Sequence, residues 1–192
     1  MEVEEEEKQT WKALRGHAYV FYHKNAWADG DFCLLWIETF AFDARHVIES
    51  YGFVVLGMDC HGAQMTVEFQ AKCKKLHIFL VYGPPNCTDV TAPADHHVGA
   101  CIKSTIAVIY DKHFDEFHAD YAADGISAMS KRINAVIWGT TAWKFLLQEK
   151  QYLLKKAFVS TGWYPLAVDG TEDHLIKVGD VQNYEFRSAP SY

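Results

Sequence analysis

Short apolar runs alternate along this chain with longer segments in which apolar residues recur at helical spacing. The runs at 53–58 and 77–82 are rich in β-branched and aromatic residues, which predicts two strands. Thr66 can cap a helix over 67–74 between them. Strand, helix and strand make a βαβ unit, whose right-handed crossover predicts parallel strands. Because 53–58 is continuously apolar, we expect this strand to be buried on both faces.

The same patterns predict elements on either side of this unit. An aromatic, β-branched strand is expected at 17–23, and Asp29 or Asp31 can cap a buried helix over 32–38. Later apolar residues keep helical spacing, which predicts helices over 95–117, 126–148 and 152–159 before an irregular tail. The fold class is therefore α/β with a helical C-terminal region. We expect an acidic leader at 1–16, an α/β domain at 17–120, and a helical appendage with an irregular tail at 121–192 packed on that domain.

Composition narrows the class of protein only a little. The 192 residues are 49% hydrophobic and 22% charged, which is ordinary for one globular domain. Five cysteines without a CxxC pair suggest neither a zinc knuckle nor a disulfide framework. No apolar run is long enough to cross a membrane, and the N-terminus is rich in glutamate, so we expect a soluble, intracellular chain.

Charge alone does not decide whether the chain binds nucleic acid. The formal net charge of −7 disfavours a general polyanion-binding surface. Five glutamates lie within residues 1–7, however, and without them 18 basic residues face the remaining 20 of the 25 acidic ones. The rest of the chain is thus nearly neutral.

Two acids carry the candidate chemistry. Asp59 closes the apolar run 53–58, and Asp95 stands just before a predicted helix. A carboxylate at the carboxyl end of a buried strand, facing another at a helix start, can hold a hard divalent cation. This arrangement points to phosphodiester chemistry with Mg²⁺ or Mn²⁺.

Three motifs in order resemble one family: 58–64 (Met-Asp-Cys-His-Gly-Ala-Gln), 82–89 (Tyr-Gly-Pro-Pro-Asn-Cys-Thr-Asp) and 93–99 (Pro-Ala-Asp-His-His-Val-Gly) followed by Lys103. Together with flanking stretches from Asn25 to Phe186 they resemble the catalytic domain of the DDE superfamily endonucleases, the transposases of pogo-like and related DNA elements. The resemblance implies part of a ribonuclease-H-like sheet, with Asp59 and Asp95 as the second and third acids of a metal-binding triad. It also implies DNA as partner, Lys103 as a weaker nucleic-acid contact, and a nuclear location, and it leaves a homo-oligomer open.

The chain departs from the family's pattern where the first acid is expected. That acid normally ends a strand well upstream of the Asn25 segment, and the residues present there hold no acid on an apolar strand. Cys60 stands where relatives often carry Asn, and Ala92 where they carry Gln. We therefore expect a fragment or a decayed copy of a transposase, so that catalytic activity stays open.

Other interpretations of the same residues remain. The chain could be a catalytically inactive DNA- or protein-binding module, or a His/Asp metallohydrolase whose metal is held by Asp59, His61 and His96. Asp59 could instead cap the following turn, and Asp95 could be the N-cap of its helix. Asp89 is a weaker candidate for the third acid.

Overall fold

The computed structural model describes residues 8–9, 18–21, 28–85, 87, 91–123, 125–164, 171 and 173–176, without the side chains of 117–123 and 173. The chain forms two compact units. One combines Met1–Val20 with Pro93–Val159, and the other combines Phe21–Ala92 with Ser160–Tyr192. The regular elements described in the first are helices, and the second holds a β-sheet.

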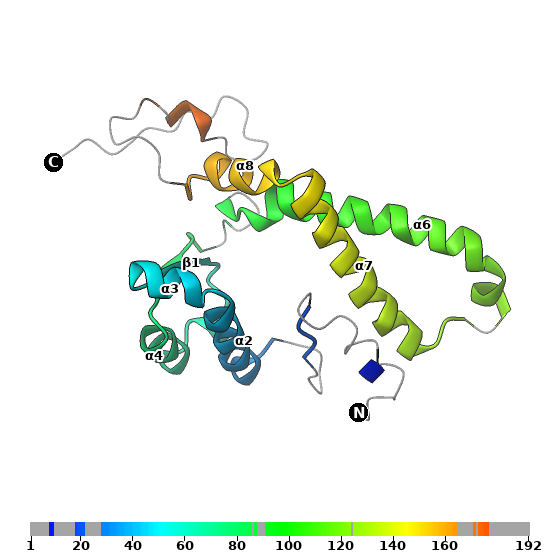
Figure 1. Ribbon diagram of the computed structural model, residues 1–192, viewed down its shortest axis with the longest axis horizontal. Coiled ribbons are helices and arrows are strands. Elements are labelled where there is room, and N and C mark those ends of the chain that lie inside the picture. Colours follow the sequence, from blue (N-terminus) through cyan, green and yellow to red (C-terminus); the bar gives the residue numbers. More distant parts are fainter. Residues whose placement is uncertain are drawn as a thin grey trace. The chain divides into compact units, whose positions relative to one another are not determined.

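The sheet-containing unit is built around the predicted βαβ element. Its helices and strands, in order, are α2 (Gly30–Asp43), α3 (Arg45–Tyr51), β1 (Val54–Met58), the 3-10 turn η1 (Gly62–Gln64), α4 (Val67–Lys75) and β2 (Ile78–Tyr82) (Figure 1). The strands are parallel, in a register that runs from Val54 opposite Ile78 to Met58 opposite Tyr82. The predicted strands, connecting helix and parallel pairing are confirmed.

Side-chain caps explain where two of these helices begin. The Asp29 carboxylate accepts a hydrogen bond from the Phe32 N–H at 2.9 Å and starts α2. The Thr66 hydroxyl accepts one from the Phe69 N–H at 3.2 Å and starts α4. Each bond satisfies an amide that the helix itself leaves unpaired. The sequence allowed Asp29 or Asp31 as the first cap, and the structure selects Asp29.

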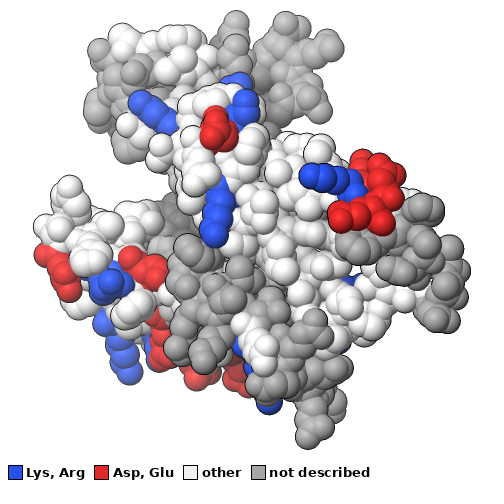
Figure 2. Space-filling view, turned by 45° about the vertical axis from the view of Figure 1, so that its right-hand side comes forward, with Lys and Arg blue, Asp and Glu red and all other residues white. Residues whose placement is uncertain are grey.

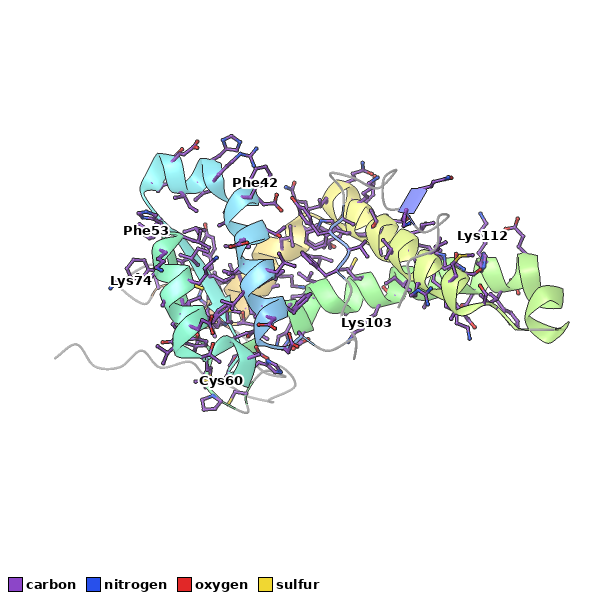
Figure 3. All side chains as sticks on the ribbon, turned by 90° about the horizontal axis from the view of Figure 1, so that it is seen from below. Phe42, Phe53, Cys60, Lys74, Lys103 and Lys112 are labelled. Carbon is purple, nitrogen blue, oxygen red and sulfur yellow. The ribbon has the colours of Figure 1, made fainter. Side chains whose placement is uncertain are left out.

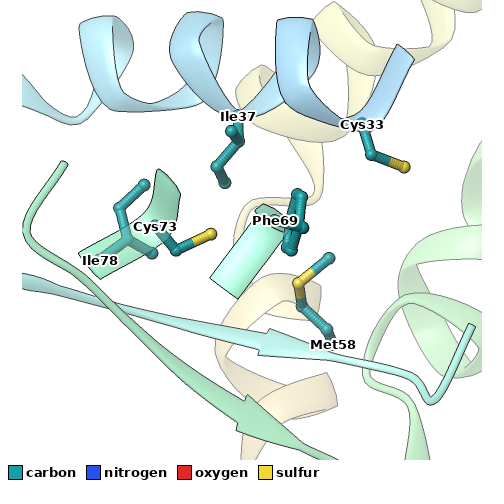
Figure 4. Packing of buried hydrophobic residues seen from close by; sticks show 6 residues of the cluster. All are labelled: Cys33, Ile37, Met58, Phe69, Cys73 and Ile78. Carbon is teal, nitrogen blue, oxygen red and sulfur yellow. The ribbon is translucent and has the colours of Figure 1, made fainter. Parts of the chain in front are cut away.

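One face of the sheet carries the core. Six buried side chains from α2, α4 and the two strands point toward one another in the space between helices and sheet (Figure 4): Cys33, Ile37, Met58, Phe69, Cys73 and Ile78. The opposite face is different, since Val55, Phe79 and Val81 are 55%, 65% and 45% exposed. The expectation of a strand buried on both faces is therefore wrong for β1, because α2 and α4 both pack on the same side.

Two further expectations also need correction. The described residues 18–21 of the predicted strand 17–23 belong to no strand; the Phe21 ring packs edge-on against Phe32, with centroids 5.4 Å apart. Aromatic and β-branched residues favour a strand only where they can pack against a neighbouring strand. Here Phe21 packs against a residue of helix α2 instead. Helix α2 is less buried than predicted, since Leu35 and Phe42 are 49% and 60% exposed.

In the helical unit, a π-helical turn, η2 (Ala94–Val98), leads into α6 (Gly99–Ala123). Helix α7 (Ala128–Glu149) returns past α6, and α8 (Tyr152–Ser160) follows (Figure 1). Val98, Leu146 and Ala157 form the buried centre. The predicted helices 126–148 and 152–159 are confirmed, whereas the one predicted at 95–117 starts later and ends at Ala123. Within the described residues, no helix is long and apolar enough to span a membrane.

Because the core lies on one side of the sheet, we expect two truncations of α2 side chains to lower the free energy of unfolding by different amounts. Ile37 is fully buried, so Ile37→Ala should lower the free energy of unfolding by about 2–5 kcal/mol. Leu35, two residues away and 49% exposed, serves as the control, and Leu35→Ala should cost less than about 1 kcal/mol. Urea denaturation followed by circular dichroism measures both. Equal losses would contradict the assigned packing face.

Candidate functional site

The turn that carries Asp59 is fixed at the carboxyl end of β1. The N–H of Gly83 donates to the carbonyl oxygen of Met58 at 2.8 Å, which extends the parallel ladder by one bond. The Cys60 thiol donates to the carbonyl oxygen of Gly83 at 3.3 Å. Figure 3 labels Phe53 just before β1 and Cys60 just after it, at opposite ends of the strand. The Asp59 turn is thereby attached to the loop that follows β2.

The Asp59 carboxylate itself is exposed and makes no hydrogen bond or ion pair with any residue that the structure describes. The N-cap position of the next turn, η1, belongs to His61, whose side chain makes no capping bond. The interpretation of Asp59 as a capping residue is therefore wrong. Both of its oxygens remain available for a ligand.

An indole ring covers this end of the sheet on the face opposite the helices. A Cβ on Gly57 would lie 2.5 Å from Cζ3 and 2.8 Å from Cε3 of Trp163, so only glycine fits beneath the ring. A Cβ on Gly83 would lie 3.5 Å from the same indole, at ordinary contact distance. Trp163 Nε1 donates to the carbonyl oxygen of Thr91 at 2.7 Å. The sequence interpretation missed Trp163, although a lone glycine inside an apolar strand signals a close approach.

Asp95 lies in the other unit, in the first turn of η2. The N-cap position there is Pro93, and the exposed Asp95 carboxylate makes no hydrogen bond or ion pair among the described residues, so the N-cap interpretation is wrong. The Gly99 N–H bonds to the Ala94 carbonyl oxygen, and a Cβ on Gly99 would lie 2.5 Å from that oxygen. A side chain at position 99 would collide with the Ala94 carbonyl oxygen, which explains why the motif 93–99 ends in glycine.

The histidines next to the acids divide between the units as the acids do. His61 is exposed and follows Asp59, whereas His96 is partly buried and follows Asp95. Burial, then Lys156 and His96, lower the pKa of His97 below its usual range. In the described part of either unit, no three His, Cys, Asp or Glu side chains form a group that could hold a metal ion. The convergence of Asp59 with Asp95, and of His61 with His96, stays a prediction, and Asp89 lies outside the described residues.

Basic side chains are dispersed. On the face that Figure 2 shows, the Lys and Arg side chains stand in small separate groups, several of them beside Asp or Glu. Lys72 in the last turn of α4 is paired with Glu38. Lys103 is exposed on α6, nine residues before Lys112 (Figure 3). The described surface in this view thus shows small, separate groups of cations and no continuous basic stripe.

Comparison with known proteins identifies one relationship. The family model described as DDE superfamily endonuclease matches residues 5–154. Neither the search of curated proteins nor the search of solved structures found a match.

The position of Cys60 predicts selective thiol chemistry. Cys60 is partly exposed, whereas Cys73 is fully buried and its burial raises its pKa from 9.0 to about 11. A higher pKa leaves less thiolate at pH 8, so iodoacetamide should alkylate Cys60 at least ~10-fold faster than Cys73. Mass spectrometry of the cysteine peptides measures both rates, and the urea-unfolded chain is the control, in which the two should agree. Equal rates in the folded chain would be inconsistent with this geometry.

Proposed function

The chain belongs to the DDE superfamily endonucleases, and on this basis we propose that it is a transposase-derived domain that binds DNA. In this proposal it cleaves phosphodiester bonds with Mg²⁺ or Mn²⁺ held by Asp59 and Asp95. The match covers most of the chain and includes both acids. The proposal also takes β1 and β2 as part of a ribonuclease-H-like sheet, with a nuclear location and a homo-oligomer as further expectations.

The observation that supports this proposal best is that both carboxylates are exposed and have no partner among the described residues. Each is exposed at a defined position, Asp59 after β1 and Asp95 in the first turn of η2, and neither is used by a described protein group. Carboxylate oxygens suit a hard divalent cation, which keeps several waters and needs one or two carboxylates. The donor set therefore fits Mg²⁺ or Mn²⁺ better than it fits a metal that prefers sulfur or imidazole.

The chain's own residues would bind and orient in this reaction. Asp59 and Asp95 would hold the cation, and the bonds from Gly83 to Met58 and from Cys60 to Gly83 keep the Asp59 turn in place. A bound divalent ion activates the attacking oxygen and stabilises the leaving one. Lys103 is exposed and can contact a phosphate, which positions DNA without reading its sequence.

A second candidate is a catalytically inactive DNA- or protein-binding module. It is favoured by the absence, in the described part of either unit, of a three-ligand group around Asp59 or Asp95. A third candidate, a His/Asp metallohydrolase, requires His61 and His96 to join Asp59. Metal analysis of the purified protein separates it from the other two, because it alone predicts bound Zn²⁺.

Removal of either acid should abolish cleavage. Supercoiled plasmid is incubated with the protein and Mg²⁺ or Mn²⁺, and nicked circles are counted over time. Asp59→Asn and Asp95→Asn keep the side-chain size but remove the charge, so each should lower the nicking rate more than about 100-fold, which corresponds to about 2.7 kcal/mol of transition-state stabilisation.

Asp31→Asn and Asp111→Asn are the matched controls, since both acids are exposed at helix positions and neither belongs to the proposed site. Metal-dependent nicking that survives in Asp59→Asn would contradict the proposal. An intact chain that binds DNA without nicking it in either metal would leave the inactive module as the function.

Lys103 gives a separate test of DNA contact. If Lys103 touches one phosphate, Lys103→Ala should weaken binding about equally for all sequences and reduce the slope of log K against log salt by about 1. Lys112→Ala, on the same helix and also exposed, is the control and should leave the slope unchanged. Fluorescence anisotropy at several salt concentrations measures both slopes. Equal slopes for wild type and Lys103→Ala would exclude this contact.

A further inference from the structure

We propose that Trp163 is a positioning residue for Asp59. The indole fills the space that Gly57 leaves on the sheet and bridges to the loop after β2, so that it holds the turn in which Asp59 stands. This inference rests on the proposed function, because it gives Trp163 a role only through the metal-binding carboxylate. Every residue that it uses belongs to the sheet-containing unit.

The first step is the fit between ring and strand. Gly57 is two residues before Asp59, and its missing side chain admits the Trp163 ring to within the distance at which a Cβ would collide. A Cβ built on Gly83, the residue that follows β2 and bonds to Met58, would lie at van der Waals distance from the same indole. One rigid ring therefore lies against both chain segments that lead to and support the Asp59 turn.

The second step is the polar attachment. Trp163 Nε1 donates to the Thr91 carbonyl at 2.7 Å, and Thr91 is bound to the Cys87 carbonyl by both its N–H and its hydroxyl, each at 2.8 Å. The indole is thus fixed in orientation by its own hydrogen bond and cannot slide along the strand without losing it. A partly buried N–H that loses its acceptor is destabilising, because the group is left without a hydrogen bond.

The third step is that few of the described side chains pack on this face of the sheet. Among the described residues the sheet has two strands, and its second face leaves Val55 and Val81 55% and 45% exposed. A metal-binding carboxylate must be held within about 0.5 Å to be effective. Trp163 supplies that support at the end of β1 where Asp59 follows.

A double-mutant cycle tests the fit. With Trp163 present, Gly57→Ala drives a methyl into the ring and should raise the alkylation rate of Cys60 by iodoacetamide about fivefold or more, as local opening by about 1 kcal/mol requires. Trp163→Ala alone should do the same. Gly57→Ala added to Trp163→Ala should cause no further rise, because the space is then empty and alanine is tolerated better than glycine in a strand.

Metal binding distinguishes positioning from a merely structural role. Calorimetric titration with Mn²⁺ should give a dissociation constant that rises about tenfold in Gly57→Ala and in Trp163→Ala, and less in Trp163→Phe, which keeps a ring but lacks the N–H. Trp143→Ala, which removes a 41% exposed indole from α7, is the control. It should change neither the alkylation rate of Cys60 nor the dissociation constant for Mn²⁺. Circular dichroism verifies that each variant is folded, and Trp163→Phe carries the test if Trp163→Ala does not fold.

The outcomes separate the two proposals. Faster Cys60 alkylation together with weaker Mn²⁺ binding supports the inference. Unchanged alkylation, or faster alkylation with unchanged Mn²⁺ affinity, overturns it and leaves the proposed function standing. A wild-type chain whose Mn²⁺ affinity equals that of Asp59→Asn overturns the proposed function, and the positioning role falls with it.

Discussion

The parallel pairing of β1 with β2 is the constraint on which the rest of the sheet-containing unit depends. Its register sends alternate side chains toward α2 and α4, where Phe69 and Ile37 are fully buried. It also brings the ends of both strands to one edge, so that Asp59 and Gly83 follow at the same level. Apolar burial on the packed face stabilises the strand pairing. The pairing also fixes the position of the turn that carries Asp59.

The two faces of this small sheet are supported by different means. Two helices cover one face along its length, whereas on the other Phe53 and Phe79 contact each other edge-on at one end and the Trp163 indole covers Gly57 at the opposite end. Between them Val55 and Val81 remain exposed. The support nearest to Asp59 therefore comes from a residue about a hundred positions later in the chain, as the numbering of the two residues shows.

Local signals made much of this structure predictable. The caps at Asp29 and Thr66, the apolar runs of both strands and the helical spacing after Ser127 depend on near neighbours, and each is confirmed. The exposure of Val55, the absence of a strand at 18–21 and the π-helical turn at Asp95 depend on what packs against each segment. Periodicity does not contain that information. The position of Asp59 directly after a strand could be predicted, but the packing of Trp163 on Gly57 could not, because the two residues are distant in sequence.

The most direct test of the central claim is paramagnetic broadening by Mn²⁺ in the ¹⁵N spectrum of the intact chain. Added in small amounts, the ion should broaden the amide signals of Asp59, Cys60 and Gly83 together with those of Ala94 and Asp95, and spare those of α4 beyond Phe69. Broadening confined to one of the two turns, or spread over unrelated acidic residues, would contradict the proposal that Asp59 and Asp95 bind the same ion.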